Sequence, residues 1–248
     1  MQHLQNLAAF LNYVFCQIYP SQCVLCKADC LTANLLCSAC WLKVEFITNP
    51  VCKKCGSSID STWHHDYCLV HKCYYVNHHY NAIISIVNYN DISKKLIGRF
   101  KFQKQMILVK LWQCWFTSIT QQLNKFKSDF IIPVPMHKEK LKMRGYNQTE
   151  FLALILAKIC KVQYRQDILH KVKNTRNQRD LSQLERVNNL LNAFSIEPNK
   201  KKIIAGKNIL LIDDVVTTGA TVNECARQLL QFGANEVNVL TIARRQLK

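Results

Sequence analysis

Apolar and polar positions along the chain follow two different periods. Apolar and β-branched residues dominate four short stretches, a pattern typical of buried strands. These stretches are residues 82–89, 129–134, 208–213 and 236–243. Between them the spacing predicts helices over residues 92–102, 106–126, 149–160 and 220–232, with Gly233 as the last helix stop, and the polar residues 181–191 are assigned to a further helix. Strands that alternate with helices predict an α/β fold with a doubly wound parallel sheet.

The first twenty residues carry apolar side chains at helical spacing and contain no Lys or Arg. This pattern favours an amphipathic helix that packs against the protein over one that lies on a membrane surface, because membrane-surface helices are usually basic. No apolar run is long enough to span a bilayer, and the features of a secretory signal are missing. We therefore divide the chain into a helix at residues 1–20, a cysteine-rich module at residues 21–77 and an α/β domain at residues 78–248.

Cysteines concentrate in the module of residues 21–77. The chain has thirteen cysteines, of which ten lie between Cys16 and Cys73, and six of these ten form three C-x-x-C pairs. Without a secretion signal this spacing favours metal over disulfides, because each C-x-x-C turn presents two thiolates to one tetrahedral zinc ion. Two zinc sites with four protein ligands each leave no position for water and are expected to be structural. The predicted ligands are Cys23, Cys26, Cys37, Cys40, Cys52, Cys55, Cys68 and His71.

The last pair of zinc ligands has an alternative. Regular C-x-x-C spacing selects Cys68 and His71, whereas an all-thiolate site would use Cys68 and Cys73. We favour His71, because neutral imidazole is an ordinary zinc ligand and the turn geometry is kept. His64 and His65 are further candidates. The cysteines outside the pairs that lie in apolar or helical surroundings are predicted to be buried thiols. These are Cys16, Cys114, Cys160 and Cys225.

The most specific run in the chain is LLIDDVVTTGAT at residues 210–221. An apolar strand delivers Asp213 and Asp214 at its C-terminal end, and a Thr- and Gly-rich turn opens the helix that begins near Ala220. Open parallel sheets bind ligands at this edge. Backbone N–H groups and hydroxyls of the turn form a cradle for a phosphate, and the carboxylates can accept hydrogen bonds from vicinal sugar hydroxyls. The ligand implied is a ribose 5-phosphate unit, because the chain has no G-x-x-x-x-G-K-[ST] loop for a nucleoside triphosphate.

Positive charge is large and unevenly distributed. The formal net charge is +17, and residues 91–180 contain nineteen Lys and Arg against six Asp and Glu. A polyanion is the expected partner, with a solvated surface that only aids solubility as the alternative. Lys138, Lys140 and Lys142 are the candidates to contact DNA phosphates. Four aromatic residues among the basic ones are candidates for base stacking, although core positions are the favoured interpretation; they are Phe100, Phe102, Tyr146 and Tyr164.

The strand, the paired acids and the T-T-G-A-T turn resemble the signature of type I phosphoribosyltransferases. Five further segments occur in the order found in the ComF family of competence-associated proteins, in which a cysteine-rich double zinc ribbon precedes a transferase-like domain. These segments are Pro133-Val134-Pro135, Arg144-Gly145-Tyr146-Asn147-Gln148, Thr175-Arg176-x-Gln178-x-x-Leu181, Glu185-Arg186-x-Asn188 and Asn192-Ala193-Phe194. The resemblance covers nearly the whole chain. It departs at the last metal pair, where the family commonly has C-x-x-C and this chain has Cys68-x-x-His71.

The resemblance implies a type I phosphoribosyltransferase-like domain that binds phosphoribosyl pyrophosphate with Mg²⁺. Carried onto this sequence, the ligand-binding residues are Asp213, Asp214, Val215, Val216, Thr217, Thr218, Gly219, Ala220 and Thr221. Arg144, Arg176 and Lys101 are the candidates to stabilise the departing pyrophosphate, because cations offset the negative charge that develops there.

Two classes of function stay open at this point. As an enzyme, the protein would transfer the ribosyl phosphate to a small nucleobase-like acceptor, although the sequence contains no recognisable base-reading segment. As a binding module, the same site would sense a nucleotide sugar while the basic region holds DNA. The ComF resemblance favours a cytoplasmic protein that handles incoming single-stranded DNA in natural transformation, beside DNA-import, helicase or recombination proteins.

Overall fold

The computed structural model of the protein describes residues 21–30, 35–52, 54–59, 68, 78–175 and 189–246. The predicted helix at residues 1–20 and most of the predicted helix at residues 181–191 lie outside the described residues, and so do His71, Cys73 and Arg176. Within the described ranges, no helix is both long enough and apolar enough to cross a membrane.

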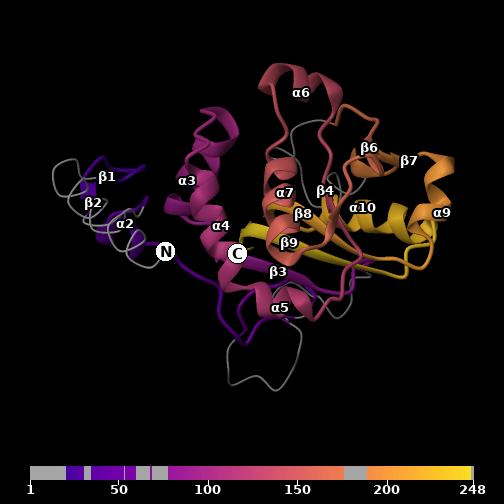
Figure 1. Ribbon diagram of the computed structural model, residues 1–248, viewed down its shortest axis with the longest axis horizontal. Coiled ribbons are helices and arrows are strands. Elements are labelled where there is room, and N and C mark those ends of the chain that lie inside the picture. Colours follow the sequence, from indigo (N-terminus) through magenta and orange to yellow (C-terminus); the bar gives the residue numbers. More distant parts are fainter. Residues whose placement is uncertain are drawn as a thin grey trace, which may run out of the picture.

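Five parallel strands form one sheet in the α/β part of the protein (Figure 1). Their order across the sheet is β3 (Ile83–Asn88), β9 (Glu236–Arg244), β8 (Asn208–Val216), β4 (Phe130–Pro133) and β5 (Gln163–Tyr164). The four predicted strands and their parallel arrangement are confirmed. β8 continues past its predicted end at residue 213, because Val215 and Val216 still pair with Ala243 and Arg244 of β9. β5 was not predicted, since two residues show no period.

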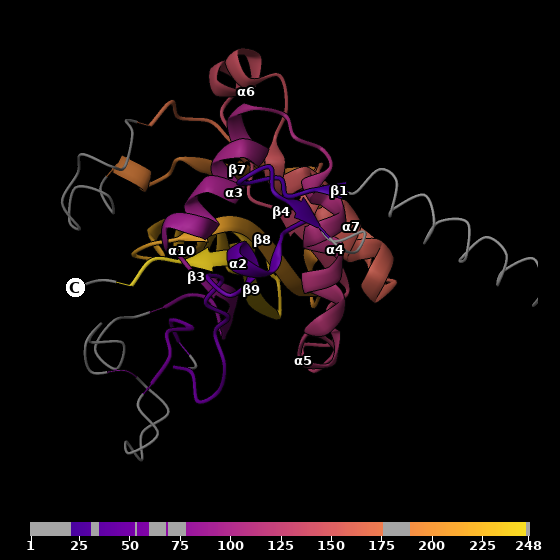
Figure 2. The ribbon, with the colours of Figure 1, turned by 90° about the vertical axis from the view of Figure 1, so that its left-hand side faces the viewer.

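Helices cover both faces of the sheet, and Figure 2 shows the sheet between α10 on one side and α4 and α7 on the other. The helices on the first face are α3 (Asp91–Phe102), α4 (Leu108–Ser118) and α7 (Gln148–Cys160), and α10 (Ala220–Gln231) lies on the second. Alternate residues of β8 reach the two faces: Leu210 and Ile212 join the core beneath α3, α4 and α7. Ile209 and Leu211 join the core beneath α10. The doubly wound arrangement is therefore confirmed.

One predicted helix, at residues 106–126, is two helices, α4 and α5 (Thr120–Asn124). The side chains at the break are hydroxyl-bearing. The Ser118 hydroxyl donates to the Trp115 carbonyl at 2.8 Å, and the Thr120 hydroxyl donates to the Phe116 carbonyl at 3.0 Å. Because these hydroxyls compete with backbone N–H groups for helix carbonyls, the first helix ends here and a second one begins.

Several short elements were not predicted, because two to seven residues are too few for a clear period. They are β1 (Ser21–Gln22), β2 (Asp29–Cys30), α2 (Ser38–Trp41), α6 (Lys138–Arg144), β6 (Leu169–Lys171), β7 (Phe194–Ile196), η2 (Pro198–Lys200) and α9 (Lys201–Ile204). Two of them matter for the site. α6 precedes α7 and buries none of its residues. β6 pairs antiparallel with β7, and both contribute to the core beneath α10.

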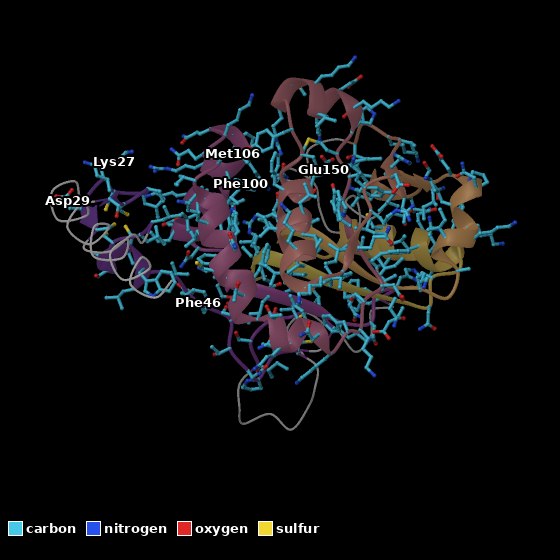
Figure 3. The ribbon with its side chains drawn as sticks, viewed as in Figure 1. Lys27, Asp29, Phe46, Phe100, Met106 and Glu150 are labelled. Carbon is cyan, nitrogen blue, oxygen red and sulfur yellow. The ribbon has the colours of Figure 1, made fainter. Side chains whose placement is uncertain are left out.

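The cysteine-rich module packs against α4 through apolar side chains. Val24 and Leu36 belong to the same core as Leu111 and Trp115 of α4. The predicted boundary between residues 77 and 78 adjoins residues that are not described, but side chains from both sides of it share this core. Figure 3 shows Lys27 and Asp29 at the outer end of the module, away from the sheet.

The outer edge of β3 is covered by residues 45–47 of the module. The N–H of Asn88 donates to the Glu45 carbonyl at 2.8 Å, and the N–H of Ile47 donates to the Ile86 carbonyl at 2.9 Å. Phe46, between them, stacks edge-on against Trp115 with 5.3 Å between the ring centroids. An exposed strand edge invites pairing with other chains, and these bonds protect it.

Candidate functional site

The turn between β8 and α10 can accommodate an anion close to the backbone. Gly219 precedes α10 with φ 80°, and a Cβ at this position would lie 3.2 Å from the Tyr80 hydroxyl oxygen. Both the backbone conformation and the space therefore favour glycine. Gly219 has no side chain to cap the helix, so the positive end of α10 faces the hollow at this turn.

The structure brings most of the predicted ribose-phosphate residues together around this hollow. The predicted residues that line it are Asp213, Val215, Val216, Thr217, Gly219, Ala220 and Thr221. Asp214 and Thr218 are not among them. Asp214 points away from the hollow, because neighbouring residues of a strand point to opposite faces of the sheet. Of the two carboxylates predicted to accept hydrogen bonds from sugar hydroxyls, that of Asp213 lines the hollow and that of Asp214 does not.

Asp214 is held by side chains from the two helices on its face of the sheet. Lys101 Nζ, near the end of α3, lies 2.8 Å from Asp214 Oδ1. Gln148 Nε2, at the start of α7, donates to Asp214 Oδ2 at 2.5 Å. Arg144 Nη1 donates to Gln148 Oε1 at 2.7 Å. Two of the three predicted cations thus reach Asp214: Lys101 contacts it directly, and Arg144 contacts it through Gln148. Gln148 belongs to a motif singled out from the sequence, but its contact with Asp214 was not predicted.

Asp213 lies half-buried on the opposite face. Burial and the neighbouring Asp214 carboxylate raise the pKa of Asp213 from 3.8 to about 7, although the charges of Lys101 and Lys171 oppose this. Lys171 belongs to β6, and its burial lowers its own pKa. Sequence reasoning missed Lys171, because a single lysine in a three-residue strand carries no signal that distinguishes it from the other lysines of the basic region.

The three predicted DNA-contacting lysines lie on α6. Lys138 and Lys142 are exposed, whereas Lys140 is half-buried and its Nζ donates to the Thr175 carbonyl at 3.2 Å. α6 ends at Arg144, so this helix leads directly to the cation that contacts Gln148. The predicted basic surface and the acidic end of β8 are therefore neighbours.

The four aromatic candidates occupy different environments. Phe100 is buried and contacts the half-buried Tyr146 edge-on, with 6.4 Å between the ring centroids, and Tyr164 is half-buried. Phe102 is different, because its side chain is 63% exposed. The core interpretation is therefore confirmed for Phe100 and wrong for Phe102.

The first cysteine cluster has the donor set of a tetrahedral zinc site. The four Sγ atoms of Cys23, Cys26, Cys37 and Cys40 lie within 4.8 Å of one another, and those of Cys26 and Cys37 are 3.5 Å apart. Four thiolates at Zn–S distances of about 2.3 Å are separated by about 3.8 Å, so the cluster fits this ion. Burial and the neighbouring thiols raise the pKa of Cys40 to about 12, because several thiolates in one place repel each other without a cation.

The second cluster brings together the thiols of Cys52, Cys55 and Cys68, all buried. The Sγ atoms of Cys55 and Cys68 are 3.3 Å apart. Three thiolates suit the same ion, and both candidates for a fourth ligand, His71 and Cys73, lie outside the described residues. Of the four predicted buried thiols, Cys225 is buried, Cys160 is half-buried and Cys16 is not described. The prediction is wrong for Cys114, which is exposed beside Trp41 in a surface cavity between α2 and α4.

Residues next to the second cluster contact the end of the sheet that carries the site. Arg244 Nε donates to the Ser57 hydroxyl, and both residues are buried. Arg244 pairs with Val216 in the sheet, directly before the turn. The second contact runs through His78, whose pKa is lowered by burial and affected by the charges of Lys54 and Cys52. Its ring lies 5.0 Å from that of Tyr80, whose hydroxyl lies beside Gly219. The second cluster is thus connected to the turn through two packed routes.

Comparison with known proteins gives matches over both parts of the chain. Residues 14–73 match the double zinc ribbon domain, and residues 144–247 match the phosphoribosyl transferase domain. Competence protein F of Haemophilus influenzae is 31% identical over 90% of this chain and 96% of its own length. Competence protein ComFC of Bacillus subtilis is 28% identical over 84% of each chain. DNA utilization protein YhgH of Escherichia coli K12 is 27% identical over 91% of this chain and 97% of its own length. The predicted architecture, a double zinc ribbon before a type I phosphoribosyltransferase-like fold, is therefore confirmed.

The two clusters predict two zinc ions per chain. We expect metal analysis of freshly purified protein to give two, and the variants Cys26→Ser and Cys55→Ser to lose one each, because each change removes one thiolate from a different cluster. Cys114→Ser, outside both clusters, is the matched control and should keep both ions. One zinc or none in the parent protein would contradict the prediction. Loss of one zinc from Cys73→Ser but not from His71→Ala would identify Cys73 as the fourth ligand of the second cluster.

The raised pKa of Asp213 predicts a pH-dependent cost to stability. The pKa of Asp213 in the native chain, about 7, lies above the ordinary value of 3.8. The native chain therefore binds the proton of the Asp213 carboxyl more tightly than the unfolded chain does. As a result, the contribution of Asp213 to the free energy of unfolding falls as pH rises from about 3.8 to about 7. Asp213→Asn should therefore raise the free energy of unfolding above pH 7, by on the order of 1 kcal/mol, and have a smaller effect near pH 4.

Urea unfolding of parent and variant at both pH values measures this effect. Asp129→Asn is the control with the opposite sign, because the N–H of Asn208 and the amine of Lys207 lower the pKa of Asp129. An Asp213→Asn effect that does not change with pH would show that Asp213 titrates as an ordinary carboxyl.

Proposed function

Because this chain belongs to the ComF family of competence-associated proteins, we propose that it handles incoming single-stranded DNA during natural transformation and binds phosphoribosyl pyrophosphate at the turn after β8. Two of the relatives above are named competence proteins and the third a DNA utilization protein, which supports work on DNA. The phosphoribosyl transferase match over residues 144–247 supports the ligand. In this role the protein acts in the cytoplasm with DNA-import, helicase or recombination proteins.

The observation that carries the proposal is the continuous contact between the acidic end of β8 and the basic surface. Asp214 contacts Lys101 and Gln148, Gln148 contacts Arg144, and Arg144 ends the helix that carries Lys138 and Lys142. A phosphate-bearing ligand and a DNA backbone both need cations nearby. This arrangement offers each of them a set of cations within one part of the molecule.

The chemistry of each group fits phosphoribosyl pyrophosphate. The turn of residues 217–221 and the positive end of α10 would hold the 5-phosphate, and Asp213 would accept hydrogen bonds from the ribose hydroxyls. Lys101 and Arg144 would lie on the pyrophosphate side, where cations stabilise a departing anion. Mg²⁺ bound with the ligand would neutralise part of the pyrophosphate charge, and carboxylate oxygens such as those of Asp213 and Asp214 are the donors it prefers.

Replacement of both acids tests the ligand site. We expect Asp213→Ala with Asp214→Ala to abolish binding of phosphoribosyl pyrophosphate, measured by calorimetric titration with Mg²⁺, because each lost charge-assisted hydrogen bond contributes about 1.5 to 3 kcal/mol. Asp129→Ala, a carboxylate at the start of β4, should bind like the parent. Binding by the double variant as tight as that of the parent would contradict the site assignment. Pyrophosphate release with candidate acceptors would identify a transferase, and binding without release would identify a binding module.

The basic surface predicts binding of single-stranded DNA with little sequence preference. Its affinity should fall steeply with salt, with a log–log slope of about −0.7 for each phosphate contacted. Replacing Lys138, Lys140 and Lys142 by Glu should weaken binding and flatten the slope, because three phosphate contacts are lost. Lys158, Lys201 and Lys202, exposed at the ends of α7 and α9, form the matched control, and their replacement by Glu should keep the parent's slope.

Fluorescence anisotropy with a labelled oligonucleotide, at salt concentrations from about 50 to 200 mM, measures both quantities. No detectable DNA binding near 50 mM salt, together with intact binding of phosphoribosyl pyrophosphate, would contradict the DNA-handling role and favour a small-molecule phosphoribosyltransferase.

A further inference from the structure

Phe102 is an exposed aromatic side chain beside the acidic site. It is the last residue of α3 and directly follows Lys101, whose amine contacts Asp214. Phe100, two residues earlier, is only 2% exposed, whereas Phe102 is 63% exposed. Two positions along a helix turn the side chain to the opposite side, so Phe102 cannot share the core position of Phe100. A large exposed ring at this position needs an explanation other than packing.

The Phe102 ring is already part of a cation–π contact. The guanidinium carbon of Arg144 lies 4.9 Å from the centre of the ring. Arg144 is also held by its hydrogen bond to Gln148, so the ring is oriented by a group that belongs to the acidic site. The ring keeps its 63% exposure despite this contact, which leaves area for a second planar partner.

The surroundings of Phe102 are positively charged. Lys104 is exposed, and its amine would lie 3.2 Å from a Cβ built at Gly145, which follows Arg144. The ends of α3 and α6 meet at the contact between Phe102 and Arg144, and both lie along the upper edge of the molecule in Figures 1 and 2. Phe100 and Met106, labelled in Figure 3, lie on either side of Phe102 in the chain, and Met106 is 41% exposed.

An exposed aromatic ring within a group of cations is the combination that binds single-stranded nucleic acid. The cations contact the backbone phosphates, and the ring stacks on a base. An apolar protein partner would match Phe102 and Met106, but it would bury the charges of Lys104 and Arg144 at a large cost. The charge of this edge therefore favours a polyanion with flat, stackable groups.

We propose that Phe102 is a base-stacking platform for single-stranded DNA, at the entrance to the acidic site. The proposal rests on the DNA-handling function above and names the contact through which that function reaches the site. A base stacked on Phe102 would lie next to Lys101 and Arg144, with an adjoining phosphate near Lys104. The strand would thus pass within reach of the groups assigned to phosphoribosyl pyrophosphate.

The test compares Phe102→Leu with Phe102→Trp. Leucine keeps an apolar side chain without a π face, so binding of oligo(dT) should weaken about tenfold, within the range expected for one lost stacking contact. The salt dependence should stay that of the parent, because no phosphate contact is lost. Tryptophan restores a π face and should restore binding. Met143→Ala, which changes an apolar side chain of α6 that is 80% exposed, is the matched control and should bind DNA like the parent.

A spectroscopic measurement separates stacking from other contacts. An oligonucleotide that carries 2-aminopurine should lose fluorescence on binding to the parent and to Phe102→Trp, and retain more of it on binding to Phe102→Leu. Binding of phosphoribosyl pyrophosphate to Phe102→Leu should stay within about twofold of the parent, because the contact between Arg144 and Gln148 remains.

Any one of the following outcomes would overturn the proposal. Parent-like DNA binding by Phe102→Leu would leave the DNA-handling role standing without the platform. Equal weakening by Phe102→Leu and Met143→Ala would show a general apolar contact. A loss of phosphoribosyl pyrophosphate binding that parallels the loss of DNA binding would show damage to the acidic site. No DNA binding by the parent would contradict the proposed function itself.

Discussion

The ion pair between Lys101 and Asp214 is the contact on which the geometry of the site depends. β8 carries two adjacent carboxylates near its C-terminal end, and such a pair is unfavourable in a poorly solvated position unless cations or donors lie close to it. Lys101 comes from the end of α3 and Gln148 from the start of α7, so satisfying Asp214 fixes the ends of two helices over one strand. Phe102 and Arg144 adjoin these two ends, and their positions follow from this constraint.

The two cysteine clusters are attached to the rest of the protein in different ways. The first cluster shares an apolar core with α4, so its thiols pack beside hydrophobic side chains. The second is connected to the site by polar and aromatic contacts, from Ser57 to Arg244 and from His78 through Tyr80 to Gly219. A metal ion bound by Cys52, Cys55 and Cys68 would therefore also stabilise the backbone beside the turn after β8. The module is a structural part of the site and not only a separate appendage.

The features predicted correctly from the sequence are those set by long patterns or by topology. The four long strands show continuous apolar runs, and the edge at which Asp213 and Asp214 lie follows from parallel pairing. Gln148 was missed because its contact with Asp214 joins segments far apart in the chain. Lys171 was missed because a single lysine in a three-residue strand carries no signal. The error on Phe102 has a different origin, since its spacing of two residues from Phe100 already places the two rings on opposite sides of α3. Cys114 lies two residues from the buried Trp112 of α4, and the same reasoning applies to it.

The positive charges near the end of α6 repel each other, and an anionic ligand would reduce this repulsion. Lys104 lies beside Gly145, which follows Arg144, and among the described residues neither Lys104 nor Arg144 forms an ion pair with a carboxylate. Like charges at short range destabilise the folded chain, and a bound polyanion removes this repulsion. Any ligand that binds only the folded state stabilises it in proportion to its affinity. If this edge binds the proposed DNA, the same side chains lower the stability of the protein alone and raise that of its complex.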